Sequence, residues 1–274
     1  SRAGRTWGEA PRPLALVLHG ILDDGGAWER VARGLVEAGL RVVAPDQRGH
    51  GRSDHLPPAA SYHLVDLVAD AEALVDRLAS GPVLLVGHSM GAAVAALLAA
   101  SRPEAVRSLV LVEPVLPPAS AGTDPVSPLR AHLAALRSSA AHPVFHDLDS
   151  AVERLRRIWP ALDAASAREP AERLAEPCPG GFRWRWDARL ASRAGLAFDG
   201  LGAGRDALLA TFARVVVPTT IVHGERSPFD RPGDRADLRT AFPGARVVGL
   251  AGGHDLHLEV PEHLAREITR ADGS

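Results

Sequence analysis

Runs of consecutive apolar residues alternate along the chain with longer segments whose apolar residues recur every three or four positions. An unbroken apolar run is typical of a strand that is covered on both faces, and the longer spacing is typical of a helix that covers it. The runs that predict strands are residues 14–18, 40–44, 83–86, 108–112, 215–224 and 246–250. Strand and helix alternate at roughly 25–30 residues, which predicts an α/β fold with a doubly wound, mostly parallel sheet.

The predicted helices follow the strands. Residues 64–78 give the clearest case, because seven apolar residues recur there at helical spacing. We also expect helices over residues 28–38, 232–240 and 261–269, and an Ala- and Leu-rich helix after residue 91.

The alternation stops at Glu113-Pro114 and resumes near residue 214. The intervening segment has no convincing strand pattern, and capping residues at Ser127, Asp149 and Asp163 predict helices in it. Helices inserted between two strands of a parallel sheet form a lid over the edge where ligands bind. We therefore predict a core formed by residues 1–113 and 214–274, and an α-helical cap formed by residues 114–213.

Composition excludes several classes of function. The 274-residue chain has a net charge of −2, which gives no general attraction for nucleic acid or an anionic membrane. All of its 31 basic residues are arginine, so it has no lysine for a Schiff base, a pyridoxal site or a phosphate loop.

Composition also bears on location. No apolar stretch reaches the roughly 18–20 residues that span a bilayer. Residues 1–8 lack the apolar core of a signal peptide. Cys178 is the single cysteine and lies in a Pro-Cys-Pro-Gly turn, so no internal disulfide can form. We expect a cytoplasmic protein without a membrane span; the sequence leaves its oligomeric state open.

The segment Gly87-His88-Ser89-Met90-Gly91 holds the best candidate nucleophile. It follows a buried strand and begins an Ala- and Leu-rich helix. The spacing G-x-S-x-G lets the backbone fold sharply and present one hydroxyl at the end of the strand. The helix directs its N-terminal N–H groups toward that hydroxyl.

A serine hydroxyl needs a base within hydrogen-bond reach. The best candidate is His254, which lies in a glycine loop after the last predicted strand. This places the histidine after the nucleophile in the chain, which is the order expected on this fold. His257 is a local alternative, and we expect it to line the loop or to pack against it.

These motifs together resemble the α/β-hydrolase superfamily, and the resemblance covers nearly the whole sheet-forming chain. The ordered matches are His19-Gly20, the glycine loop of residues 46–54, Gly87 to Gly91, and Gly253-His254 followed by Glu259-Val260-Pro261-Glu262. The resemblance implies an oxyanion hole formed by the backbone N–H groups of Ile21 and Met90. It does not specify a substrate.

The acid of the catalytic triad departs from the commonest pattern of this superfamily. Many members carry a carboxylate three residues after the glycine that closes the penultimate strand; here that position is Ser227. Some branches instead place the acid after the strand that follows the nucleophile helix, where this chain has Glu113. We favour Glu113, with Asp230 and Glu225 as alternatives; a structural role for Glu113 in capping a helix or anchoring the lid is the competing interpretation.

Other side chains receive weaker interpretations. The resemblance implies no metal and no organic cofactor. His50, His55 and His63 are typical surface or cap-facing residues, and His254-x-x-His257 lacks further clustered ligands for zinc. Trp159, Trp184 and Trp186 are candidates to line an apolar substrate pocket, although packing within the cap is the default expectation.

The resulting hypothesis is a serine hydrolase with a helical lid that cleaves a small-molecule acyl substrate. A serine at residue 89 argues against the epoxide hydrolase and haloalkane dehalogenase branches, which use a carboxylate nucleophile. A carboxylic ester is the first choice and a thioester of an acyl carrier is the second; hydrolysis of a C–C bond and perhydrolysis stay open. The alternative from another class is a ligand-binding protein that retains the fold without catalysis.

Overall fold

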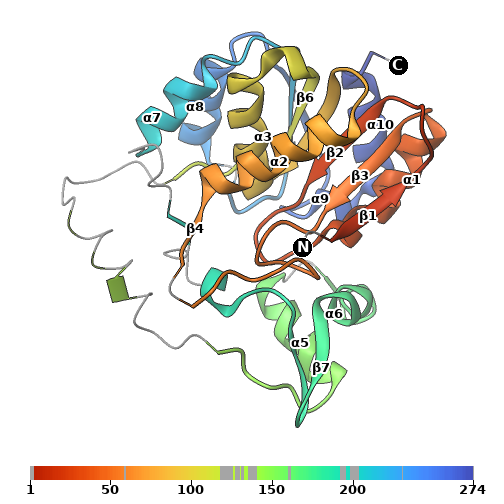
Figure 1. The fold of residues 1–274 in the computed structure, drawn as a ribbon, viewed down its shortest axis with the longest axis vertical. Helices are drawn as coiled ribbons and strands as arrows, with labels where there is room; N and C mark the ends of the chain where they lie inside the picture. The colour runs from red at the N-terminus through yellow and green to blue at the C-terminus, as the bar shows by residue number, and fades with distance from the viewer. Residues whose placement is uncertain are drawn as a thin grey trace.

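The computed structural model describes most of the chain. The fold is built on one seven-stranded sheet (Figure 1). The strand order is β1-β3-β2-β5-β6-β10-β11. All neighbouring strands are parallel except β1, which runs antiparallel to β3 at one edge. The described residues are 3–58, 60–117, 126, 130, 133–134, 141–159, 162–191, 196–197, 204–229 and 231–273.

Six of the seven strands of this sheet coincide with the apolar runs, and β1 is the exception. The seven strands are β1 (Gly4–Trp7), β2 (Leu14–Leu18), β3 (Arg41–Pro45), β5 (Val83–His88), β6 (Val106–Val112), β10 (Thr219–Gly224) and β11 (Arg246–Leu250). Successive side chains of a strand point to opposite faces, and in β2 Leu16 and Leu18 join one buried cluster while Ala15 and Val17 join the other. A continuous apolar run is therefore what this sheet requires.

Helices cover both faces (Figure 1). One face packs against α2 (Leu64–Leu78), α3 (Met90–Ser101), α7 (Arg205–Phe212) and α8 (Pro232–Ala241). The other packs against η1 (Gly25–Trp28), α1 (Glu29–Glu37), α9 (Leu256–Glu259) and α10 (Pro261–Ala271). The predicted α/β class and mostly parallel sheet are confirmed.

The strand order changes direction at β2. From β2 the chain moves to β3 on one side, and β5 then pairs with β2 on the other side. Ligands bind at the carboxyl ends of the strands at such a switch point in open α/β sheets. The segments that follow β2 and β5 begin with His19 and Ser89, so the fold brings them to this switch point.

The described part of the insertion forms a small unit below the sheet in Figure 1. It contains α5 (Leu148–Ile158), α6 (Arg168–Leu174), the strands β7 (Ala175–Cys178) and β8 (Gly181–Trp184), and η3 (Ala188–Ala191). These elements enclose a buried cluster of their own that includes Phe145, Leu155 and Trp184. Ser127 lies outside the described residues, and α5 is capped by Asp147, whose side chain accepts from Ser150 N–H, rather than by Asp149.

The prediction of no strand in the insertion is wrong at residues 175–184. Strands β7 and β8 form an antiparallel hairpin there. Its strands are only four residues long and carry Pro177, and its turn uses Gly180 and Gly181 at φ 89° and 143°. Strands this short carry too little alternation to be recognised from the sequence. A further short pair joins β4 (Tyr62–His63) to β9 (Leu196–Ala197).

Two more elements differ from expectation. Strand β1 was not predicted, because an exposed edge strand of four residues has no apolar run. Helix α7 falls within residues 114–213, yet Leu208 and Phe212 pack in the core cluster beside α3 and α8. The short η2 (Pro103–Ala105) links α3 to β6. Within the described ranges, no helix is both long and apolar enough to cross a membrane.

Candidate active site

Ser89 stands at a sharp turn between β5 and α3. Its backbone has φ 51° and ψ −113°, and its N–H donates to Val112 O at 3.0 Å. A Cβ at Gly87 would lie 2.2 Å from Gly91 O, and one at Gly91 would lie 2.2 Å from Leu18 O. Only glycine fits at either position, which is the physical reason for the G-x-S-x-G spacing.

Glu113 and His254 lie in direct contact. His254 Nδ1 is 2.8 Å from Glu113 Oε2, and the Glu113 side chain is buried. The carboxylate also accepts from Gly224 N–H at 2.6 Å and from the Ser227 hydroxyl. Because a carboxylate only accepts, the proton on the histidine lies on Nδ1, which leaves Nε2 with a lone pair.

The other candidate acids are placed differently. Ser227 occupies the position that commonly carries the acid in this superfamily, and its hydroxyl hydrogen-bonds Glu113 instead. Glu225 is exposed, and its side chain lies beside Gly249. Asp230 lies outside the described residues. The hydrogen bond from Ser227 to Glu113 was missed, and the signal for it was a hydroxyl where a carboxylate was expected.

A hydrogen bond joins His254 to His88, the residue before Ser89. His88 Nε2 is 3.0 Å from His254 O, and the two rings are 4.7 Å apart. Phe229 packs against the other side of His254, with ring centres 4.5 Å apart. The loop after β11 therefore holds His254 beside the turn that carries Ser89.

The segment after β2 passes next to Ser89. A Cβ at Gly20 would lie 3.3 Å from Ser89 Cβ. His19 is fixed by the glycine loop, since Gln47 N–H donates to its Nε2 at 2.9 Å and the Gln47 side chain donates to its carbonyl at 2.6 Å. Ile21 follows in this segment, and Met90 is the first residue of α3, where amides have no partner within the helix. Their part in an oxyanion hole stays a prediction.

Comparison with known proteins places this geometry in a family. The family model for the alpha/beta hydrolase fold matches residues 13–261. The chain belongs to the α/β-hydrolase family.

Relatives of this α/β hydrolase differ in what they act on. The chain is 32% identical over 260 residues to 2-(acetamidomethylene)succinate hydrolase of Mesorhizobium japonicum, covering 94% of this chain and 87% of that protein. It is 30% identical to the mouse sn-1-specific diacylglycerol lipase ABHD11, covering 96% and 81%. Among solved structures, a thioesterase domain from the curacin biosynthetic pathway is 40% identical with a TM-score of 0.88, covering 96% of this chain and 93% of that one.

The three tryptophans of the insertion pack in its own buried cluster. Trp184 and Trp186 are 3% and 6% exposed, and Trp159 is partly buried against the same cluster. The rings of Trp184 and Trp186 stack with centres 6.4 Å apart. This is the default packing role; contact of these rings with a substrate stays a prediction.

A charged network joins this cap to the segment after β2. Arg173 of α6 donates to Asp24 Oδ1 at 2.5 Å and to Asp23 Oδ1 at 3.1 Å, and all three side chains are buried. Asp23 in turn accepts from His257 Nε2 at 3.0 Å. Burial alone raises the pKa of Asp23, but Arg173 and His257 outweigh it and hold the pKa well below its usual range. Asp23 is therefore an ionised carboxylate inside the protein.

Proposed function

We propose that this α/β hydrolase cleaves an acyl bond through a covalent intermediate on Ser89. The observation that carries the proposal is the 2.8 Å contact between His254 Nδ1 and the buried Glu113, made in the loop that holds His254 beside the nucleophile turn. Glu113 keeps the histidine in the tautomer whose Nε2 can accept a proton.

The reaction then follows from these positions. His254 Nε2 takes the proton of the Ser89 hydroxyl as its oxygen attacks the acyl carbon. The amides of Ile21 and Met90 stabilise the negative oxygen of the tetrahedral intermediate. His254 returns the proton to the leaving alcohol or thiol, and the acyl group stays on Ser89. Water, deprotonated by His254, attacks the acyl-enzyme and releases the acid, which restores the serine.

The leaving group is the open part of the proposal. The chemistry of the site accepts an ester or a thioester, and the sequence placed the ester first. The likeness to the thioesterase domain, at 40% identity over nearly the full length of both chains, favours the thioester. The substrate that we propose is therefore an acyl thioester, with a carboxylic ester of the same acyl chain as the second candidate.

Matched substrates test this choice. The rate of hydrolysis is measured for an oxoester and a thioester that share one acyl chain and otherwise identical leaving groups, and each rate is divided by the uncatalysed rate. We expect the corrected ratio to favour the thioester by more than about tenfold, or roughly 1.4 kcal/mol of barrier. A ratio above tenfold in the other direction would make the protein an esterase.

The binding-protein alternative makes a different prediction. A protein that had lost catalysis would hydrolyse neither substrate faster than Ser89→Ala does. Activity on both substrates that disappears in Ser89→Ala excludes a ligand-binding role as the sole function.

A further inference from the structure

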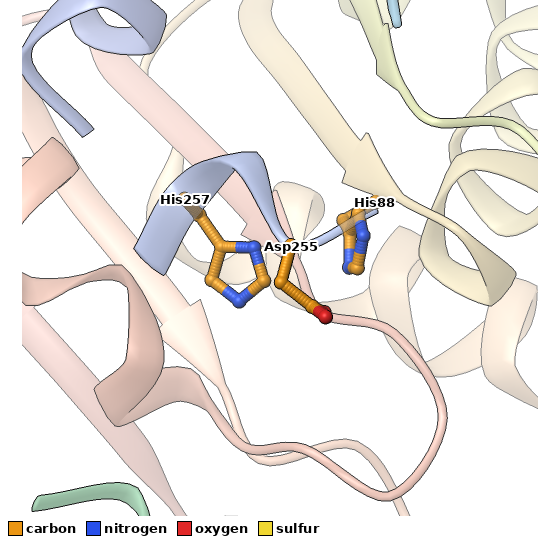
Figure 2. A group of neighbouring side chains, drawn as sticks. All are labelled: His88, Asp255 and His257. Atoms are coloured by element: carbon orange, nitrogen blue, oxygen red, sulfur yellow. The ribbon is translucent and has the colours of Figure 1, made fainter. Parts of the chain in front are cut away.

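Three buried side chains next to the proposed active site form a cluster that catalysis does not use. They are His88, at the end of β5, and Asp255 and His257, in the segment that follows β11. One donor atom of each lies within 4.8 Å of the donor atoms of the other two. Figure 2 shows the Asp255 side chain between the two rings. His88 is 3% exposed, Asp255 9% and His257 0%.

His257 has the hydrogen bonding of a metal ligand. Its Nε2 lies 3.0 Å from Oδ2 of the Asp23 carboxylate, which accepts, so that nitrogen carries the proton and donates it. Its Nδ1 is buried, has no hydrogen-bond partner, and carries the lone pair. The ring is held by Trp28, against which it stacks at 4.9 Å and 10°. A carboxylate that fixes the far ring nitrogen is the usual support of a metal-binding histidine.

His88 and Asp255 also have unused capacity to coordinate an ion. His88 Nε2 bonds the carbonyl of His254, and its buried Nδ1 has no partner. Asp255 adds a carboxylate to the cluster, and the described residues form no hydrogen bond to its oxygens, so these are available as ligands.

Two histidines and one carboxylate, with a fourth position for water, match the ligand set of many zinc sites. Ligand atoms about 2.0–2.2 Å from a tetrahedral ion lie roughly 3.3–3.5 Å apart. The donor atoms therefore have to move closer than their present separations of up to 4.8 Å. This movement displaces His88, which precedes Ser89, and Asp255, which follows His254.

We propose that His88, Asp255 and His257 bind a zinc-like transition-metal ion, and that binding inhibits the hydrolase by displacing the neighbouring Ser89 and His254. The inhibition rests on the proposed function, whereas the binding does not. The expectation of no zinc site came from ligand spacing along the sequence, where His88 lies far from the other two.

Equilibrium dialysis against Zn²⁺ followed by metal analysis tests the binding. We expect one tightly held ion per chain in the wild type, and at least tenfold weaker binding in Asp255→Asn, which keeps the shape of the side chain. His257→Phe, which keeps a ring against Trp28, should show the same loss. The control His146→Gln removes a histidine whose side chain is 93% exposed and should bind as the wild type does.

A second control separates this site from the proposed catalytic pair. If His254 and Glu113 held the ion, His254→Gln would lose zinc and Asp255→Asn would keep it, which overturns the proposal. We expect the reverse. Absence of tight zinc binding in the wild type overturns it as well.

The inhibition is measured as the rate with Zn²⁺ divided by the metal-free rate of the same variant. We expect wild-type activity to fall at least tenfold at saturating zinc and to return when the ion is chelated. Asp255→Asn should need at least tenfold more zinc for the same loss. Equal sensitivity of the two proteins contradicts the proposal. If the protein hydrolyses no acyl substrate, the proposed function fails, and dialysis still decides whether the metal site exists.

Discussion

Ser89 and Glu113 occupy equivalent positions on neighbouring parallel strands. Each is the first residue after its strand, and their φ angles are 51° and 50°. Each also donates its N–H to the next strand of the sheet, Ser89 to Val112 O and Glu113 to Val222 O. Their flanks differ, however, because Ser89 lies between Gly87 and Gly91, whereas Glu113 is followed by proline.

The difference shows two ways of holding a left-handed backbone at a functional position. At the turn that carries Ser89, close packing of β2, β5 and α3 leaves no room for a Cβ at Gly87 or Gly91. The two glycines therefore indicate the conformation in the local sequence. At Glu113 the conformation is supported by long-range partners, namely Gly224 N–H, the Ser227 hydroxyl and His254. Such strain persists where surrounding structure fixes it, and this often happens at functional sites.

Replacing the acid should break this arrangement with the largest effect on rate. Glu113→Gln removes the charge that orients His254 and stabilises its protonated form. We expect kcat to fall on the order of 10³–10⁴-fold, measured on the best acyl substrate.

Glu225→Gln is the matched control, because it changes the same residue type at the end of β10 on an exposed side chain. Its rate should stay within about threefold of the wild type, as should that of Asp230→Asn. A larger loss of kcat in either control than in Glu113→Gln would contradict the assignment of Glu113 as the acid.

Gly91→Ala tests the local side of the comparison. The added Cβ would meet Leu18 O at 2.2 Å, so the turn has to shift. We expect a loss of about 3 kcal/mol in the free energy of unfolding, measured with urea, together with a loss of activity.

Gly81→Ala provides the control for that measurement, because nothing lies within 4 Å of a Cβ there. Its unfolding free energy should change by less than about 0.5 kcal/mol. Equal stability of the two variants would mean that crowding does not explain the glycine spacing.

His50 lies buried in the glycine loop of residues 46–54. Burial is the main cause that lowers the pKa of His50 to about 3, helped by His19, whose ring lies 5.0 Å away. A folded-state pKa below the unfolded one means that stability is complete above about pH 6.5 and falls as the pH drops toward 3. Between pH 7 and 5, His50 should cost the wild type about 2 kcal/mol of unfolding free energy.

Urea unfolding at pH 7, 6 and 5 checks this contribution. His50→Gln should show a shallower loss of stability with falling pH than the wild type, and the exposed His146→Gln should follow the wild type. Parallel curves for His50→Gln and the wild type would show that His50 does not titrate as described.

Ser227→Ala should have the smallest effect. It removes one donor to Glu113 Oε2 but leaves His254 and Gly224 in place. A hydrogen bond to a charged group contributes about 1.5 kcal/mol, so we expect kcat to fall roughly tenfold with little change in KM.

The contrast with Glu113→Gln decides how Ser227 acts. An unchanged kcat would mean that the Ser227 hydroxyl does not position Glu113. A loss as large as that of Glu113→Gln would mean that the hydroxyl is as important for kcat as the Glu113 charge. Ser101→Ala, whose hydroxyl bonds only the helix carbonyl of Leu98, controls for the loss of a serine.

The sequence predicted what depends on neighbouring residues. The apolar runs located six strands of the sheet, and the periodicity located α2 at Leu64–Leu78. It favoured Glu113 but left Asp230 and Glu225 as alternatives, because the contact between Glu113 and His254 joins residues 141 positions apart. The grouping of His88 with Asp255 and His257 depends on the fold in the same way, and hairpin β7–β8 is too short to produce a pattern.

The most direct test of the account is covalent labelling by a fluorophosphonate, which reacts with an activated serine. We predict that wild-type protein gains one adduct, that peptide mapping places it on Ser89, and that Ser89→Ala gains none. Labelling should slow strongly in Glu113→Gln and remain at the wild-type rate in Glu225→Gln. A wild-type protein that is not labelled, or an adduct on another serine, would contradict the assignment of Ser89 as a nucleophile activated by His254 and Glu113.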